Sequence, residues 1–145
     1  MNVIFTPEKE KIVTVMLGVN IMAVDNLRRI NKILSKRKLN ARQYSILHQI
    51  TRTDVPLPRS QKELSKRSSI RENRIVSILH KMGKSGLLRR EKTTDRLLNT
   101  VTITEKGRKE LDKAENDVRV YYDELLSTIS HNEKHALICL LKNYE

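Results

Sequence analysis

The sequence predicts a mainly α-helical chain of one domain that contains a single small β-hairpin. Apolar residues recur at spacings of three and four along most of the chain, which is typical of amphipathic helices. Residues 87–107, LLRREKTTDRLLNTVTITEKG, instead place two short apolar runs on either side of a charged stretch. The second run is rich in β-branched residues, which favour a strand, so this segment predicts a hairpin with a long basic tip.

The N-terminal segment predicts a long helix that begins at Thr6-Pro7, an N-cap followed by proline at the first helical position. Its apolar residues form two stripes on different faces. A domain of this size can cover one face of such a helix, and a second subunit is the simplest cover for the other. The first stripe is Ile12, Val15, Met16, Val19, Met22, Ala23, Leu27, Ile30 and Leu34, and the second is Val13, Leu17, Ile21 and Val24.

The middle of the chain predicts three shorter helices. The first begins at a capping box, NARQ at 40–43, and continues to about Ile50, before TDVPLP at 53–58 breaks the chain. A second capping box, SQKE at 60–63, starts the next helix, which reaches residue 66 or 67. A turn at Ser68-Ser69 leads to the third helix, from Arg71 to about Lys84, and Gly86 ends it. This order indicates a helix–turn–helix followed by the hairpin.

Two more helices are expected after the hairpin, one from Thr104 and a last one from the capping box SHNE at 130–133. Both carry apolar stripes, like the N-terminal helix. We therefore expect segments 1–36 and 104–145 to be dimerisation helices and residues 37–103 to form a separate lobe within one chain of 145 residues.

Charge is concentrated in the middle of the chain. The formal net charge is +12, and residues 59–96 hold twelve Lys and Arg against four Asp and Glu, a net +8, whereas residues 104–145 carry a net −2. Such a field attracts polyanions, either nucleic acid or an acidic membrane surface, although a basic but merely soluble surface has the same composition. The chain has no run of about 18 apolar residues, no evident secretory signal and one cysteine, so we expect a cytoplasmic protein without a membrane partner.

In a helix–turn–helix, the start of the second helix reaches base edges in the major groove of DNA. Here the candidate residues are Arg71, Asn73, Arg74 and Ser77. Arginine can donate two hydrogen bonds to guanine, asparagine pairs with adenine, and serine contacts base edges or phosphate. An ordinary solvent-exposed helix has the same residue types. The prediction of DNA binding therefore rests on the combination of helix, turn, helix and basic hairpin.

Segments SQKELSKRSSIRENRIVSILHKMGKSGLLRR (60–90) and DRLLNTVTITEKG (95–107) closely resemble the MarR family of winged helix–turn–helix regulators. The order of elements extends the resemblance over nearly the whole chain. It implies a homodimer that binds a pseudo-palindromic operator in double-stranded DNA. It also implies dimerisation through the terminal helices and, as in many members, release of DNA by a small-molecule inducer. Most members repress transcription and some activate it.

The resemblance assigns the basic hairpin as a wing aimed at the minor groove, with Lys92, Asp95 and Arg96 as its contact residues. Asp95 would fix the guanidinium of Arg96, which would enter a narrow groove; an ordinary exposed Asp–Arg pair is the alternative. Many relatives carry a second arginine where this chain has Leu97.

Expected contacts to the DNA backbone are Ser60, Gln61, Lys81 and Lys84. Expected dimer contacts are Val13, Leu17, Ile21, Tyr121, Leu125, Leu137 and Leu141.

The other groups of candidate functional residues are better explained by structural roles. His131 and His135 share a helix face, but no third metal ligand is visible nearby, so a polar face is preferred and no metal or other cofactor is expected. Cys139 lies among leucines and isoleucine and is expected to be a buried apolar group. Tyr44 and His48 could line a ligand pocket, or they are a core tyrosine and a surface histidine.

Two functions remain open from the sequence. The first is a homodimeric, sequence-specific transcriptional regulator. The second is an architectural or adaptor protein that uses the same fold to bind DNA non-specifically or to bind a protein. No arrangement of catalytic residues has a supporting context, and an enzyme is not expected.

Overall fold

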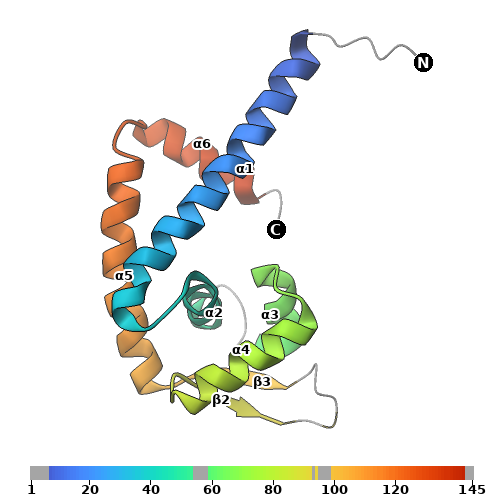
Figure 1. Ribbon diagram of the computed structural model, residues 1–145, viewed down its shortest axis with the longest axis vertical. Helices are drawn as coiled ribbons and strands as arrows, with labels where there is room; N and C mark the ends of the chain where they lie inside the picture. Colours follow the sequence, from blue (N-terminus) through green and yellow to red (C-terminus); the bar gives the residue numbers. More distant parts are fainter. Residues whose placement is uncertain (1–6, 54–58, 93, 95–98, 143–145) are drawn as a thin grey trace, which may run out of the picture.

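The computed structural model describes residues 7–53, 59–92, 94 and 99–142. It confirms a mainly helical chain with a small hairpin, in the predicted order (Figure 1). Thr6, the expected cap of the first helix, and the wing residues Asp95, Arg96 and Leu97 lie outside the described residues. The elements are α1 (Pro7–Leu34), η1 (Ser35–Arg37), α2 (Ala41–Thr51), β1 (Arg59–Ser60), α3 (Gln61–Ser68), α4 (Glu72–Lys84), β2 (Leu88–Glu91), β3 (Thr100–Ile103), α5 (Glu105–Leu125) and α6 (His131–Lys142).

The hairpin belongs to a three-stranded antiparallel sheet with strand order β1-β3-β2. Strand β3 is central: Arg90 of β2 and Arg59 of β1 both pair with Val101. Val101 is fully buried, whereas Arg89 of β2 is exposed. The short strand β1 was not predicted, because two residues beside a proline-containing loop carry no strand period.

The helices form a lobe and a stem (Figure 1). The lobe contains α2, α3, α4 and the sheet, and the stem contains α1, α5 and α6. The C-terminal end of α1 joins the two parts: Asn31 Oδ1 accepts a hydrogen bond of 2.7 Å from the backbone N–H of Ala41. The guanidinium of Arg37 lies 2.8 Å from the carboxylate of Asp117 on α5. The predicted capping box of α2 is complete, with Asn40 and Gln43 each bonded to the other's backbone.

One apolar core fills the lobe and reaches the lower stem, where α5 contributes Leu111, Ala114 and Val118. Ile75, Leu79 and Met82 of α4 are fully buried, as their spacing predicts. From α1 only the C-terminal part takes part, through Ile30 and Leu34.

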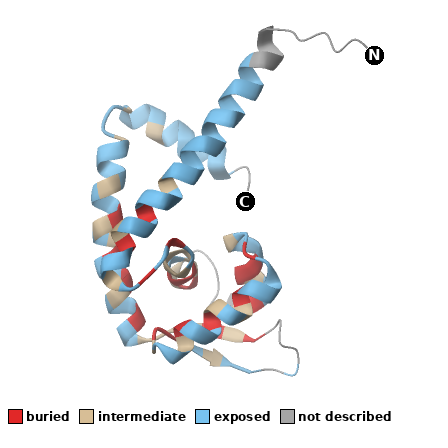
Figure 2. Cartoon of the chain, viewed as in Figure 1, coloured by how far each residue is buried: buried red, intermediate tan, exposed pale blue. Residues whose placement is uncertain are grey.

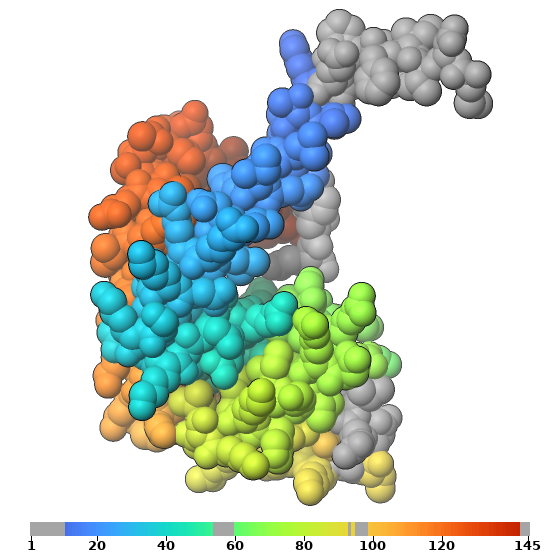
Figure 3. Space-filling model, in the orientation of Figure 1, coloured from blue at the N-terminus to red at the C-terminus, as the bar shows by residue number. Residues whose placement is uncertain are grey.

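Both apolar stripes of α1 are exposed over its N-terminal half, which rises above the lobe (Figures 2 and 3). Val15 of the first stripe is 63% exposed and Ile21 of the second is 71% exposed. The expectation that the domain covers one of these faces is therefore wrong for the N-terminal half of α1, because only the C-terminal part of the helix packs on the core, through Ile30 and Leu34. Cys139 is also exposed, contrary to expectation, since the described part of the chain buries no residue of α6.

The start of α5 is tied to the turn between α4 and β2. Thr104 caps α5 by accepting a hydrogen bond from the backbone N–H of Gly107, and its hydroxyl donates to the carbonyl oxygen of Gly86 at 2.5 Å. A Cβ at Gly107 would lie 2.0 Å from the carbonyl oxygen of Leu87. In the segment TEKG, the threonine therefore caps α5, and the glycine allows the backbone of α5 to approach the backbone of Leu87 closely.

Candidate nucleic-acid interface

The turn between α3 and α4 is held by short-range hydrogen bonds. Ser69 adopts a left-handed conformation, with φ of 53°, directly after α3 ends. Ser65 donates from its hydroxyl to the carbonyl oxygen of Ile70 at 2.6 Å, and the N–H of Ile70 donates to the carbonyl oxygen of Ser65 at 3.2 Å. Ile70 itself is buried, so the turn is anchored to the core and sets the angle between the two helices.

Helix α4 has one buried and one solvent-facing side. The predicted base-reading residues Arg71, Asn73, Arg74 and Ser77 are all exposed. Within the described part of the chain, their side chains have neither a hydrogen bond nor an ion pair to another residue. The start of α4 therefore presents donors and acceptors that are available to an outside partner, on a backbone fixed by the core.

Lys81 and Lys84, two of the expected contacts to the DNA backbone, are exposed near the end of α4. The other two are engaged within the lobe. Ser60 caps α3, accepting a hydrogen bond of 3.1 Å from the backbone N–H of Glu63. Gln61 is 1% exposed, and its amide oxygen accepts two hydrogen bonds from Arg90, at 3.0 and 2.6 Å. The side chain of Gln61 is thus used to hold β2 against α3, and its burial corrects the expectation of an outward-facing residue.

The base of the wing is fixed by this contact and by the sheet. Lys92, the described member of the three expected wing contacts, is exposed directly after β2. Arg89 is exposed and lies on the opposite side of β2 from Arg90, so it adds a further cation to the outer side of the hairpin. The hairpin and α4 lie at the same end of the lobe (Figure 1), and the described part of both elements carries exposed cations, among them Lys81, Lys84 and Lys92.

Tyr44 and His48 of α2 do lie together, and α5 adds a third group to them. Their rings stack with centroids 6.3 Å apart, and His48 Nδ1 lies 3.0 Å from Glu115 Oε1. Burial, with the nearby negative charge of Glu115, raises the pKa of Tyr44 to about 12. Asn26 of α1 lies beside this group through a 3.4 Å hydrogen bond to the hydroxyl of Tyr122, and its own amide oxygen is buried without a partner among the described residues.

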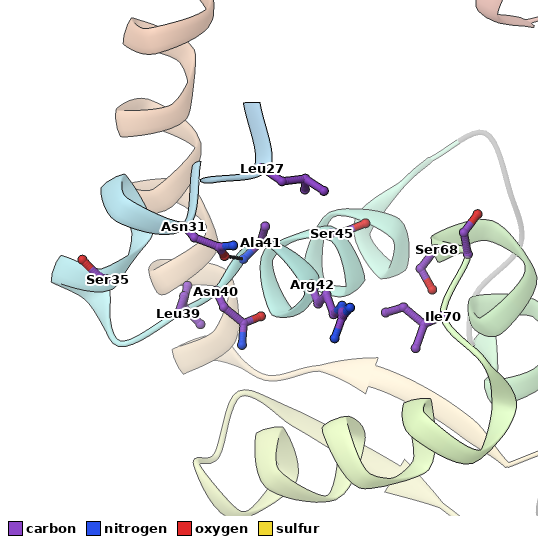
Figure 4. Close-up of a pocket in the computed structure, with 11 residues that line it drawn as sticks. Leu27, Asn31, Ser35, Leu39, Asn40, Ala41, Arg42, Ser45, Ser68 and Ile70 are labelled. Atoms are coloured by element: carbon purple, nitrogen blue, oxygen red, sulfur yellow. Dashed lines mark hydrogen bonds between the residues drawn. The ribbon is translucent and has the colours of Figure 1, made fainter. Parts of the chain in front are cut away.

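A larger hollow of about 830 Å³ opens between the end of α1, the start of α2 and the α3–α4 turn (Figure 4). Leu27 and Leu39 line one side of it. Arg42 projects from α2 toward α4 at the other side. The sequence could not reveal this hollow, because its walls come from residues 27–45 and from residues 68–70, which only the fold brings together.

Two findings concern function classes other than DNA binding. Within the described residues, no group of three or more His, Cys, Asp or Glu could hold a metal ion; Cys139 Sγ and His135 Nε2 are 3.7 Å apart. Among the same residues, no helix combines the length and the apolar character that a membrane span requires.

The architecture is that of a winged helix–turn–helix protein with a helical stem. No family model matches the sequence. Comparison with solved structures finds the transcriptional regulator BldR from Sulfolobus solfataricus, at 27% identity and a TM-score of 0.77, with 97% of this chain and 98% of that chain covered. A Cys-to-Ser mutant of MarR from E. coli in complex with operator DNA matches at 20% identity and a TM-score of 0.74, over 92% and 95% of the two chains. CouR from Rhodococcus jostii RHA1 bound to p-coumaroyl-CoA matches at 20% identity and a TM-score of 0.76, over 90% of each chain.

These likenesses confirm the resemblance seen in the sequence. The chain has the winged helix–turn–helix fold of the MarR-family transcriptional regulators, over nearly its whole length.

Proposed function

We propose that this protein is a homodimeric, sequence-specific regulator of transcription that binds double-stranded DNA, and that it acts as a repressor relieved by a small ligand. The observation that carries the proposal is the exposed start of α4, where Asn73, Arg74 and Ser77 have no partner within the described chain. A core-anchored helix with free hydrogen-bonding groups and a basic strand beside it suits a major groove flanked by phosphates. The matched MarR complex contains operator DNA, which supports the same use of this fold.

The homodimer is proposed from the exposed apolar residues of the stem. Val13, Leu17 and Ile21 of α1 are 50%, 57% and 71% exposed, and similar residues line α6. Contiguous apolar surface of this kind marks a protein interface. Of the other expected contacts, Leu125, Leu137 and Leu141 are 41%, 43% and 59% exposed, whereas Tyr121 is half-buried and packs against the core of its own chain. We therefore place the interface on α1, α6 and the end of α5, with Tyr121 at its edge.

The ligand is proposed to bind beside Tyr44 and His48, between the stem and the lobe. The unpartnered amide oxygen of Asn26 and the hydroxyl of Tyr122 add hydrogen-bonding groups to the aromatic surface there. Small-molecule sites typically combine apolar and aromatic side chains with a few polar groups, and these are the groups gathered here. The matched CouR structure holds p-coumaroyl-CoA, which supports a small-molecule partner for this fold.

The test is selection of bound sequences from random duplex DNA, followed by titration of the selected duplex and of random duplex at several salt concentrations. A sequence-specific regulator should prefer the selected duplex by about a thousandfold or more. If each subunit neutralises about four phosphates, the log–log salt slope for the dimer is near −7. Equal affinity for both duplexes would support the architectural alternative, and a flat salt response would support a protein partner.

A further inference from the structure

A second, smaller pocket lies beside the start of the recognition helix α4. It has a volume of about 300 Å³ and is lined by Arg42 of α2, Ser69 and Ile70 of the turn, and Arg71 and Arg74 of α4. It adjoins the larger hollow, which shares Arg42, Ser69 and Ile70 with it. In Figure 4 the guanidinium of Arg42 points from α2 toward α4, and Arg71 and Arg74 line the same pocket as Arg42.

The positive charge of this pocket is uncompensated within the described chain. No acidic residue lines it, and none of the three arginines forms an ion pair or a side-chain hydrogen bond with a described residue. Other arginines of the molecule do have partners: Arg37 pairs with Asp117, and Arg67 pairs with Glu63. Three like charges that converge on one hollow repel one another, and an anion bound there removes the repulsion.

Guanidinium groups recognise a particular class of anion. Their planar N–H forks match the paired oxygens of a phosphate or carboxylate, and several forks can share one tetrahedral phosphate. A pocket beside the start of a recognition helix also lies where the sugar–phosphate backbone borders the major groove. A backbone phosphate is thus an anion of the right chemistry that DNA binding would bring to this place.

We propose that Arg42, Arg71 and Arg74 form one oxyanion site that grips a phosphate of the operator backbone. The proposal rests on the DNA-binding function proposed above and changes the roles of two residues within it. Arg71 and Arg74, which the sequence suggested as readers of guanine, hold the backbone instead. Asn73 and Ser77 then remain to read base edges. Arg42, which the sequence did not single out, extends the DNA interface from the helix–turn–helix to α2.

The experiment uses the full chain as Arg42→Gln and Arg74→Gln, because both side chains are exposed and neither belongs to the core. The matched control is Arg119→Gln, which removes the same charge from α5 where Arg119 is 79% exposed and pairs with Asp123. Affinity is measured for the selected operator and for random duplex over a range of salt concentrations. Circular dichroism confirms that each variant is folded.

Each variant of the pocket should weaken binding to both duplexes by the same factor, about tenfold for each half-site. The log–log salt slope of the dimer should become shallower by about 2, since each subunit loses about one phosphate contact. The control should leave both quantities unchanged. An Arg42→Gln variant with wild-type affinity and slope would overturn the proposal, and so would an Arg74→Gln variant that only relaxes the preference at one base pair. A wild-type protein that binds no duplex would instead refute the proposed function.

Replacing single phosphates of the DNA shows whether the pocket binds a backbone phosphate or a free phosphate ion. Uncharged methylphosphonate is placed at single positions of the operator backbone, and each duplex is titrated with wild type and with Arg42→Gln. One position per half-site should weaken the wild type but cost Arg42→Gln nothing further. If no position shows this coupling, while inorganic phosphate binds the DNA-free protein in calorimetry and Arg42→Gln abolishes that binding, the pocket serves a free anion and the backbone assignment is wrong.

Discussion

The guanidinium of Arg90 donates two hydrogen bonds to the amide oxygen of Gln61, across 29 residues of sequence. Gln61 begins α3 and is buried, while Arg90 lies on β2 at the base of the wing. The wing and the helix–turn–helix are therefore joined by side chains as well as by the sheet.

Removing this contact should destabilise the lobe. Arg90→Ala leaves a buried amide oxygen without its charged donor, and we expect the free energy of unfolding to fall by about 1–3 kcal/mol. Arg89→Ala removes the neighbouring, exposed arginine and should change it by no more than about 0.5 kcal/mol. Urea denaturation of both variants provides the measurement. Equal effects would mean that the contact with Gln61 contributes little.

The close approach at Gly107 predicts a large effect of a single methyl group. Gly107→Ala would place Cβ 2.0 Å from the carbonyl oxygen of Leu87. Backbone must shift to accommodate it, and the free energy of unfolding should fall by about 3 kcal/mol or more. Gly83→Ala is the control, because its Cβ would meet Leu88 at an ordinary 3.9 Å and the helix should gain about 0.5–1 kcal/mol. Thermal unfolding should therefore move in opposite directions for the two variants.

Charged residues on α1 should separate the proposed dimer without unfolding the chain. Leu17→Glu combined with Ile21→Glu places carboxylates where each protomer exposes apolar surface, and neither residue contributes to the core of its own chain. Sedimentation should show folded monomers, and binding to the operator should weaken strongly. Val120→Glu changes an equally exposed apolar residue outside the proposed interface and should leave the association state unchanged. A double variant that remains a dimer would exclude Leu17 and Ile21 from the interface.

Tyr44 predicts a pH dependence at alkaline pH. Its pKa is raised to about 12 in the folded chain, against 10.0 for an ordinary tyrosine, because burial and Glu115 disfavour the phenolate. A raised pKa contributes stability that is fully present below pH 10 and is lost as the pH rises from 10 to 12. Tyr44→Phe should remove this part of the decline in the free energy of unfolding. Ultraviolet titration should show one phenol ionising about two pH units above a free tyrosine in the wild type and not in the variant.

Short-range patterns predicted most of the fold. The start of α2 followed from the capping box at Asn40, and the end of α4 from Gly86, because each signal acts within a few residues of the boundary. Partners that are far apart in the chain were not predictable in this way. Position 61 was expected to contact the DNA backbone, but Gln61 is buried and bonded to Arg90, which is 29 residues away in the chain. The pocket of Arg42 with Arg71 and Arg74 likewise exists only once α2 and α4 are packed.

The apolar stripes of α1 show a second limit of prediction from the sequence. Their period predicted one long helix with two apolar faces. The helix is confirmed, since α1 extends from Pro7 to Leu34. The period carries no information on which molecule covers each face. The structure shows instead where the helix leaves its own chain: Ile30 and Leu34 pack in the core, and the residues before them do not.

The junction at Thr104 and Gly107 determines where the molecule can bend. The first turn of α5 is bonded to the residues before β2 at three points: Thr104 to Gly86, Thr104 to Leu87, and Lys106 to Ser85. Because there is no room for even one methyl group between Gly107 and Leu87, we expect this turn and the start of β2 to move as one rigid unit. In the dimer proposed above, a change in the distance between the two copies of α4 would therefore have to arise farther along α5 or at the end of α1.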